Sequence, residues 1–399
     1  MKKNLLLTCL IFLSTVLFSQ GTWVQKASCL GNGRAGAFTF AIGSCGYVGG
    51  GQINSSGTYV SDFWEYNTTN NSWTQKADYA GGNRLSSSAF TINNLGYVCC
   101  GFNGSCKNDV WSYNPTTNAW TQKNNFSGAA RYGAFAFTIG SNAYLGKGTP
   151  NGPPFFTDFW KYDPITDSWA QKSSFTSNIT AAAYGFSINN KGYAGLGTDG
   201  SGNFTDEFFE YDPITDAWTQ KAAFPILTTN VSFFVIYNCA YVGTGNVSLT
   251  ALNNNLYKFD PNANSWTAIA SLGSSGRAGG IGFAIANKGY LGLGVSSAGS
   301  YLNDLWEYTP ADYSVNEITN QNIVNVKIDM FNKSIDLSMN TKLQEASFLI
   351  YNTSGQLMTN EKINSTHQKF NINKLTKGAY IYVVKGINKN IKTEKFIII

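Results

Sequence analysis

Arginine is rare in this chain of 399 residues, and its four copies are regularly spaced. They occupy one position of a repeated segment, as Arg34, Arg84, Arg131 and Arg277. Two further repeats have Thr180 and Asn230 where we expect this position. A guanidinium group binds a carboxylate through two parallel hydrogen bonds, so four such groups around one opening could hold an anionic ligand. They could equally tie loops to neighbouring acidic residues, and the sequence leaves both roles open.

Four aromatic residues fall in connecting segments near the same end of the repeats. They are Phe102, Phe155, Phe156 and Tyr301. Rings at such a rim can bind sugars or partner proteins, and they can also simply cover the ends of packed sheets. We therefore treat them as candidate binding residues beside the arginines.

Residues for acid-base, nucleophilic or metal chemistry are missing from the repeats. The single histidine, His367, lies near the C-terminus, so the repeats can form neither a Ser/His/Asp nor a Cys/His relay. The pair Cys99 and Cys100 has no second pair at zinc-ribbon spacing. Asp199 begins a loop with calcium-loop spacing, but Phe204 stands where the sharp turn needs glycine. We expect no catalytic residue, no metal site and no cofactor.

Two aromatic landmarks define the repeats. A segment of the type TWTQKA recurs at intervals of 47 to 50 residues, with its tryptophan at positions 23, 73, 120, 169, 218 and 266. A segment of the type DFWEY recurs in phase with it, centred at positions 64, 111, 160, 209, 257 and 306. Its first residue is an acid in most repeats, Asp62 for example, and we expect this acid to make structural hydrogen bonds. Four short antiparallel strands per period predict the blades of a β-propeller.

The repeats resemble kelch motifs, whose blades have a glycine pair after the second strand and spaced aromatic residues in the third and fourth strands. Gly49 and Gly50 match that pair in the first repeat, and the resemblance covers residues 21–310. It implies an all-β fold, a six-bladed kelch-type β-propeller. The segment at Trp23 precedes the first complete repeat and none follows the last, so the N-terminal strand is expected to close the last blade.

The two ends of the chain differ from the repeats. Lys2 and Lys3 precede an apolar run, which predicts a signal peptide. The change in composition near residue 317 predicts a small β-sandwich of six or seven strands at the C-terminus. We therefore assign residues 1–20 to the signal peptide, 21–312 to the propeller, 313–322 to a linker and 323–399 to the β-sandwich.

The C-terminal segment resembles the sorting domains of type IX secretion substrates. The resemblance rests on residues 348–358, on residues 372–384 and on residues 377–380, which match the family's Lys-Gly-x-Tyr turn. The usual Tyr-Pro-Asn-Pro opening is absent near residues 322–331. The resemblance implies that the type IX export machinery is a partner and that the protein is secreted or held at the outer cell surface.

The charge balance narrows the remaining partners. Residues 21–317 hold 15 Lys and Arg against 18 Asp and Glu, although the whole chain has a net charge of +5, so a nucleic-acid partner is not expected. After residue 20 no apolar segment approaches the length of a membrane-spanning helix, so we do not expect an integral membrane protein.

Three functions remain open. The leading hypothesis is a secreted, non-enzymatic propeller that binds a protein or a glycan, with an anionic ligand as one form of it. The second is a carbohydrate-active enzyme similar to the sialic-acid mutarotases, which use arginine to hold a carboxylate sugar. The third is a structural or adhesive surface protein, and fold alone does not choose among them.

Overall fold

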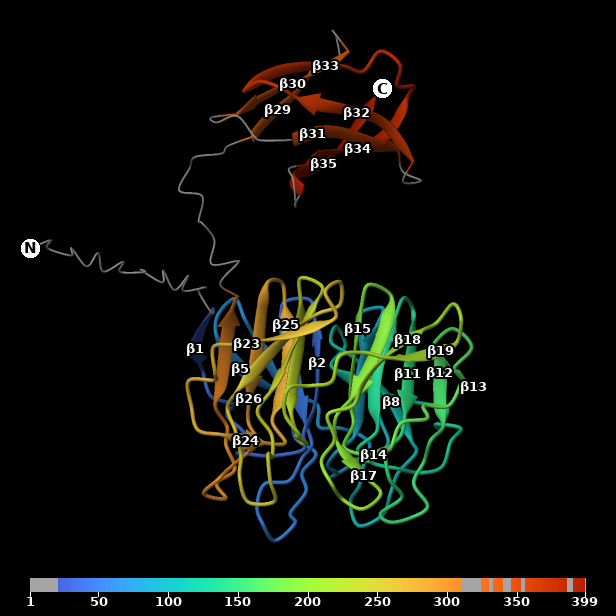
Figure 1. Ribbon diagram of the computed structural model, residues 1–399, viewed down its shortest axis with the longest axis vertical. Helices are drawn as coiled ribbons and strands as arrows, with labels where there is room; N and C mark the ends of the chain where they lie inside the picture. Colours follow the sequence, from blue (N-terminus) through green and yellow to red (C-terminus); the bar gives the residue numbers. More distant parts are fainter. Residues whose placement is uncertain are drawn as a thin grey trace, which may run out of the picture. The chain divides into compact units, whose positions relative to one another are not determined.

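The computed structural model describes residues 21–310, 324–329, 333–339, 346–352, 356–385 and 390–398. Every regular element in these ranges is a β-strand. The strands belong to two compact units, divided between residues 313 and 314 (Figure 1). The segments predicted as signal peptide and linker, residues 1–20 and 313–322, lie outside the described residues. None of the described segments forms a helix able to cross a membrane.

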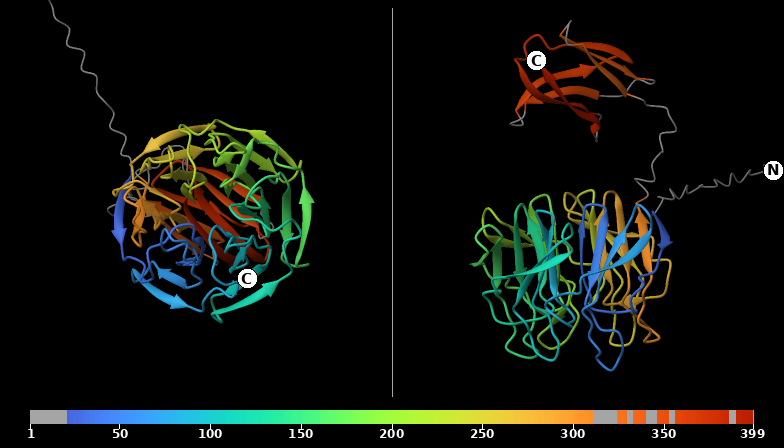
Figure 2. Two further views of the ribbon diagram at one scale, coloured as in Figure 1. Left: turned by 90° about the horizontal axis from the view of Figure 1, so that it is seen from below. Right: turned by 180° about the vertical axis from the view of Figure 1, so that it is seen from behind.

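The first unit is a ring of six blades, each a four-stranded antiparallel sheet (Figure 2). Blade 1 consists of β2 (Phe38–Ile42), β3 (Cys45–Gly49), β4 (Phe63–Asn67) and β5 (Ser72–Lys76). Blade 2 consists of β6 (Ser88–Ile92), β7 (Leu95–Cys99), β8 (Val110–Asn114) and β9 (Ala119–Lys123). Blade 3 consists of β10 (Phe135–Ile139), β11 (Asn142–Gly146), β12 (Phe159–Asp163) and β13 (Ser168–Lys172).

The other three blades repeat this order. Blade 4 consists of β15 (Tyr184–Ile188), β16 (Lys191–Gly195), β18 (Phe208–Asp212) and β19 (Ala217–Gln220). Blade 5 consists of β20 (Ser232–Ile236), β21 (Cys239–Gly243), β22 (Leu256–Asp260) and β23 (Ser265–Ile269). Blade 6 consists of β25 (Ile281–Ile285), β26 (Lys288–Gly292), β28 (Leu305–Thr309) and β1 (Thr22–Lys26).

Strand β1 closes the ring, as the sequence predicts. It pairs antiparallel with β28, with Trp23 opposite Tyr308 and their ring centroids 4.9 Å apart. The indole of Trp23 donates a hydrogen bond to the carbonyl of Ala270, at 3.0 Å. Joining the two ends of the repeat region in one sheet leaves blade 6 with four strands, like every other blade.

The core lies between the blades and is largely aromatic. The first strands alternate buried and half-buried residues, and their buried phenylalanines pack against the next blade. Gly96 at the start of β7 leaves room for the ring of Phe40 from blade 1, where any side chain would collide with it. This close approach explains why glycine opens the second strand in most blades.

Two kinds of connection follow from the up-and-down order of the strands. Tight turns join the first to the second and the third to the fourth strands at one end of the propeller. Longer connections join the second to the third strand and each blade to the next at the other end, which we call the loop face; in blade 1 they are residues 50–62 and 77–87. Figure 1 shows them at the lower end, around the short pairs β14 (Ile179–Ala181) with β17 (Thr198–Asp199) and β24 (Arg277–Ala278) with β27 (Val295–Ser296).

The second unit is a two-sheet β-sandwich. One sheet contains β29 (Val324–Asp329), β30 (Ser334–Met339) and β33 (His367–Asn371). The other has the order β32 (Leu357–Ile363), β31 (Ala346–Asn352), β34 (Gly378–Lys385) and β35 (Asn390–Ile398). Phe348 of one sheet stacks on Phe370 of the other, with ring centroids 4.3 Å apart. The fold class predicted from the sequence is therefore confirmed for both units.

Candidate functional site

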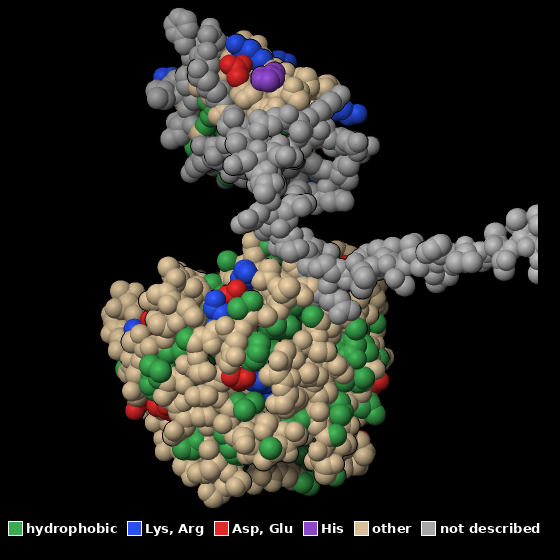
Figure 3. Space-filling view, turned by 90° about the vertical axis from the view of Figure 1, so that its left-hand side faces the viewer, with side chains coloured by type: hydrophobic (Ala, Val, Ile, Leu, Met, Phe, Trp, Pro, Cys, Tyr) green, Lys and Arg blue, Asp and Glu red, His purple; other side chains and the backbone are tan. Residues whose placement is uncertain are grey.

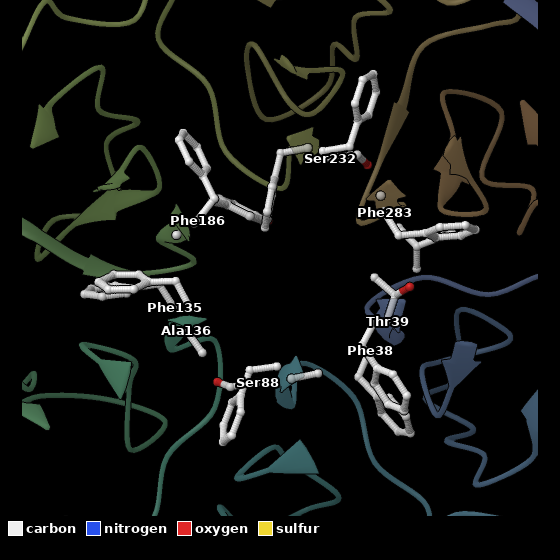
Figure 4. Close-up of a pocket in the computed structure, with 18 of the residues that line it drawn as sticks. Phe38, Thr39, Ser88, Phe135, Ala136, Phe186, Ser232 and Phe283 are labelled. Carbon is white, nitrogen blue, oxygen red and sulfur yellow. The ribbon is translucent and has the colours of Figure 1, made fainter. Parts of the chain in front are cut away.

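An axial channel runs between the first strands of the six blades and encloses a cavity of about 550 Å³ (Figure 4). Six equivalent segments line it, residues 36–41, 86–91, 133–138, 182–187, 230–235 and 279–284. No lining residue has a charged side chain. Its volume is within the roughly 300–1,000 Å³ that small-molecule sites occupy.

The wall of the channel is built from the inward-facing residues of these strands. Figure 4 shows Thr39 and Ala136 directed into the channel, while the rings of Phe38 and Phe135 point away from it, between the blades. Small and hydroxyl-bearing residues thus face the cavity in these blades, because the period-2 alternation of a strand places the neighbouring large rings in the core. The Thr39 hydroxyl donates to the carbonyl of Tyr47 at 2.9 Å, and its oxygen can still accept a hydrogen bond.

Residues with left-handed backbone frame the loop-face mouth of this channel. One residue per blade has a φ between 52° and 65°, namely Gly36, Ser86, Gly133, Ala182, Asn230 and Gly279. In four of the neighbouring pairs of this ring, the N–H of one residue donates a hydrogen bond to the carbonyl of the other, at 2.8 to 3.0 Å. Within the described residues Ala182 makes none of these bonds, so the ring is open at blade 4.

The four arginines lie outside the channel lining. Their side chains are at most 2% exposed. Each guanidinium forms two hydrogen bonds with the aspartate that precedes the third strand of its own blade, at 2.6 to 3.0 Å. The pairs are Arg34 with Asp62, Arg84 with Asp109, Arg131 with Asp158, and Arg277 with Asp304. Their forks turn back into their own blades, and their gathering around one mouth of the channel stays a prediction.

Further donors complete each pair. Nη1 of Arg131 also donates to the carbonyl of Lys147 at 2.9 Å, and the indole of Trp160 donates to Asp158 at 2.7 Å. Burial alone would raise the pKa of Asp158, but the bonds from Arg131 and Trp160 outweigh it and hold that pKa below its ordinary value. The other three aspartates behave in the same way. These contacts favour the structural role of the arginines, and their role in ligand binding stays a prediction.

Blade 5 departs from the sequence-based alignment. The carbonyl of Thr228, not of Asn230, accepts the hydrogen bond from Gly197, just as the carbonyl of Arg84 accepts the one from Gly51. Thr228 is fully buried, and Asn230 belongs instead to the ring at the channel mouth. The residue equivalent to the arginines in blade 5 is thus Thr228, two positions earlier than expected.

The predicted rim aromatics are half-buried links between connections, and none lines the channel. Phe102 lies between Tyr59 of blade 1 and Tyr132 of blade 3, with ring centroids 6.3 and 5.1 Å away. The hydroxyl of Tyr301 in blade 6 accepts a hydrogen bond from Gln52 of blade 1, at 3.0 Å. These contacts join adjacent blades, while one side of each ring stays accessible on the loop face.

The other two predicted aromatics come from the connection after β11. The ring of Phe156 covers the guanidinium of Arg131, whose central carbon is 4.1 Å from the ring centroid. Phe155 lies beside Gly200 in the corresponding connection of blade 4. The structure therefore brings Phe156 to an arginine, as the sequence analysis grouped them, but in a packed contact rather than at an open site.

A buried lysine escaped the sequence analysis. Lys147 is 1% exposed, with its ammonium 5.1 Å from the ring centroid of Phe175 and 3.0 Å from the carbonyl of Ser177. Burial lowers its pKa to about 8, although the carboxylates of Glu207 and Asp158 favour the charged form. The sequence contains a signal for this lysine, because the equivalent position is occupied by the uncharged residues Gly50 in blade 1 and Cys100 in blade 2.

Metal and thiol chemistry finds no support in the described part of the chain. No cluster of three or more His, Cys, Asp or Glu residues in those ranges could hold a metal ion. Cys99 and Cys100 are fully buried thiols, and Cys106 is also outside any disulfide. The Asp199 loop is closed by its own carboxylate, which accepts amide hydrogen bonds from Ser201 and Asn203 at 2.8 Å.

Comparisons with known proteins agree with this architecture. Residues 315–399 match the family described as secretion system C-terminal sorting domain, and residues 83–127 match the Kelch motif. No curated protein matches the chain. A solved structure titled "Structure of YjhT" aligns with a TM-score of 0.62 at 18% identity, over 70% of this chain and 95% of that one. At this identity the likeness concerns the fold.

The chain is therefore a kelch-repeat β-propeller protein with a type IX C-terminal sorting domain. The sorting domain directs the protein to secretion or to the cell surface, as the sequence analysis predicts. What the exported propeller does is a separate question, which depends on its own surface.

Proposed function

We propose that the propeller is a binding module that works outside the cell and takes a neutral glycan at the loop face and in the axial channel. The observation that carries this proposal is the uncharged channel of about 550 Å³, lined by small, hydroxyl-bearing and aromatic residues. Sugars are bound through such mixtures, because their ring faces are apolar and their edges carry hydroxyl groups.

The distribution of charge supports a neutral ligand. The four arginines are already paired with aspartates, so an incoming carboxylate would have to displace a buried partner. Figure 3 shows a similar arrangement on one side of the propeller, where the charged side chains are few and several of opposite charge lie side by side. An anionic ligand therefore has less support than a neutral one.

The test is a glycan array probed with the purified full chain at low and at high salt. We expect binding to neutral glycans that changes little with salt, since screening acts on charge pairs. Binding restricted to sialylated or uronate-containing glycans, and lost at high salt, would contradict the neutral ligand. A silent array would contradict glycan binding altogether.

A protein ligand is the second candidate, because four apolar side chains are exposed on the loop face. They are Leu30 (73%), Leu227 (54%), Val247 (37%) and Leu249 (88%). Exposed apolar groups on a polar surface are common in protein interaction sites. The variant Leu249→Ser should weaken capture of a protein partner from the cell surface by cross-linking. Ile214→Ser, which alters a 90% exposed residue in a turn at the opposite end of the propeller, is the matched control.

A further inference from the structure

One section of the channel wall is aromatic. Phe233 of β20 occupies the inward-facing position at which the other first strands have Thr39, Ala89, Ala136, Gly185 and Gly282. Its ring centroid is 6.3 Å from that of Tyr184 and 5.7 Å from that of Phe186, both in β15. We call Tyr184, Phe186 and Phe233 the aromatic pocket. Phe186 has a counterpart in every blade, whereas no other first strand has an aromatic residue in the position of Phe233.

Two glycines explain why this pocket can exist. Gly185 and Gly282 let β15 approach β10 and β25 approach β20, since a side chain at Gly282 would collide with the backbone of Phe233. The first strands of blades 4 and 5 approach each other least closely of all neighbouring pairs. The ring of Phe233 occupies the space left between them.

Tyr184 adds a polar group to the pocket. Phe38, Phe135 and Ile281 have the same strand position and also border the channel, but they are fully buried, whereas Tyr184 is half-buried. Burial is the only influence on the pKa of its hydroxyl, with no contribution from a hydrogen-bond partner among the described residues. Burial raises its pKa, so the phenol stays protonated and can both donate and accept a hydrogen bond.

The channel mouth is open at blade 4, next to the aromatic pocket. Ala182, two residues before Tyr184, is the member of the channel-mouth ring that makes no hydrogen bond to its neighbours. The mouth is thus least constrained directly beside the aromatic pocket. The ring of Phe233, the hydroxyl of Tyr184 and the open part of the mouth thus lie where blades 4 and 5 adjoin.

We propose that the aromatic pocket binds one neutral sugar ring, with its apolar face on Phe233 and one of its hydroxyls bonded to Tyr184. The absence of charge from the channel lining disfavours a charged sugar, because a buried charge without a partner is costly. This inference rests on the proposed function and names the sugar-binding position within it.

The test measures the binding of neutral hexoses, deoxyhexoses and N-acetylhexosamines to the full chain by saturation-transfer NMR and calorimetry. Phe233→Ala should weaken binding about tenfold, which corresponds to about 1.4 kcal/mol. Tyr184→Phe removes only the hydroxyl and should weaken binding about fivefold with an unchanged melting temperature. Ala136→Leu should also weaken binding by narrowing the channel while the pocket stays intact. Phe102→Ala, on the loop-face rim, is the matched control and should bind like the wild type.

The outcomes separate this inference from the proposed function. Wild-type affinity in Phe233→Ala and Ala136→Leu, with loss in Phe102→Ala, would place the sugar at the rim and overturn the inference, while the proposed glycan binding would stand. If no neutral sugar binds the wild type although larger neutral glycans bind on the array, the single-sugar pocket is also overturned. Failure of both experiments would overturn the proposed function as well.

Discussion

Blades 1, 2, 3 and 6 differ from blades 4 and 5 in the side-chain contacts that stabilise their connections on the loop face. The first group buries an arginine against an aspartate, as in Arg131 with Asp158. Blade 4 has Thr180 and Glu207 in these two places, and blade 5 has Thr228 and Asn255. The strands of all six blades are nevertheless alike, so the ion pair is one of several ways to satisfy the buried carbonyls beneath the loops.

The two blades without arginine replace it differently. In blade 4, Lys147 of the preceding blade brings its ammonium over Phe175, as Arg131 lies over Phe126. In blade 5, the amide of Asn253 donates to the carbonyl of Thr244 at 3.0 Å, a bond that an arginine makes in blades 1, 2, 3 and 6. The comparison teaches that a buried carbonyl needs a donor, whereas the charge of that donor can change or disappear. The same two blades form the aromatic pocket.

The largest expected effect concerns strand β1, which gives blade 6 the same four strands as blades 1, 2 and 3. Deleting residues 21–26 removes β1 and the packed ring of Trp23, and it exposes the edge of β28. Losing a packed tryptophan alone costs about 3–5 kcal/mol, so thermal melting of the full chain should fall sharply. Val24→Ser, at a 51% exposed position of the same strand, should leave melting nearly unchanged. An unaltered melting temperature after the deletion would contradict the closure.

Breaking one ion pair should have the next largest effect. Arg131→Gln leaves the Asp158 carboxylate without its cation and should lower the free energy of unfolding by about 3–5 kcal/mol, measured by denaturant titration. The double variant Arg131→Met with Asp158→Leu should recover most of this loss, because no charge is left unpaired. Equal losses in the single and double variants would show that the pair itself is not what stabilises the blade.

The same single variants test the anionic-ligand hypothesis. If the arginines bind a ligand, glutamine at Arg34, Arg84, Arg131 or Arg277 should abolish calorimetric heat with acidic glycans at low salt and leave melting nearly unchanged. If they are structural, melting falls and there is no heat to lose.

Lys147→Met should change how the free energy of unfolding depends on pH, because burying the ammonium of Lys147 destabilises the folded protein. The native pKa of Lys147 is about 8 and the ordinary value is 10.5, so the unfolded chain binds more protons between these values. Wild-type stability should therefore rise relative to the variant, by up to about 3 kcal/mol, as the pH increases from 8 to 10.5. Parallel stability curves for the two proteins over this window would contradict the lowered pKa.

The smallest effect is expected in blade 5. Thr228→Val removes one hydroxyl, which donates to the carbonyl of Asn246 at 2.8 Å, and should cost about 1 kcal/mol in denaturant titration. A loss as large as that of Arg131→Gln would erase the distinction between the two groups of blades.

The chain's local pattern was sufficient to predict the six blades and the closing strand, while the sorting domain was predicted from its resemblance to a known family. Alternation of apolar residues and recurrence of tryptophan are properties of neighbouring residues, and they determine which strands form and in what order. Closure followed from counting, since the segment at Trp23 has no partner at its own end of the repeats. The structural role of the aspartates also followed from their repetition, and the hydrogen bonds to the arginines confirm it.

The candidate site depended on contacts that linear spacing does not contain. Trp218 and Ile236 are 18 residues apart, whereas Trp169 and Ile188 are 19 apart, and this one-residue difference accounts for part of the two-residue error in the arginine-equivalent position of blade 5. The hydrogen bond between Gly197 and Thr228 resolves it. A strand's register is set by its partner strand and not by the length of the connection before it.

Burial decided the rest. The sequence determined that four arginines share one repeat position, but only the tertiary structure shows that each is turned into its blade and paired with an aspartate. Likewise, Phe233 and Tyr184 read as ordinary strand residues until the unequal spacing of the first strands exposes them to the channel. The physical reason is that a side chain's type fixes what it can bind, while its neighbours fix whether it is still free to do so.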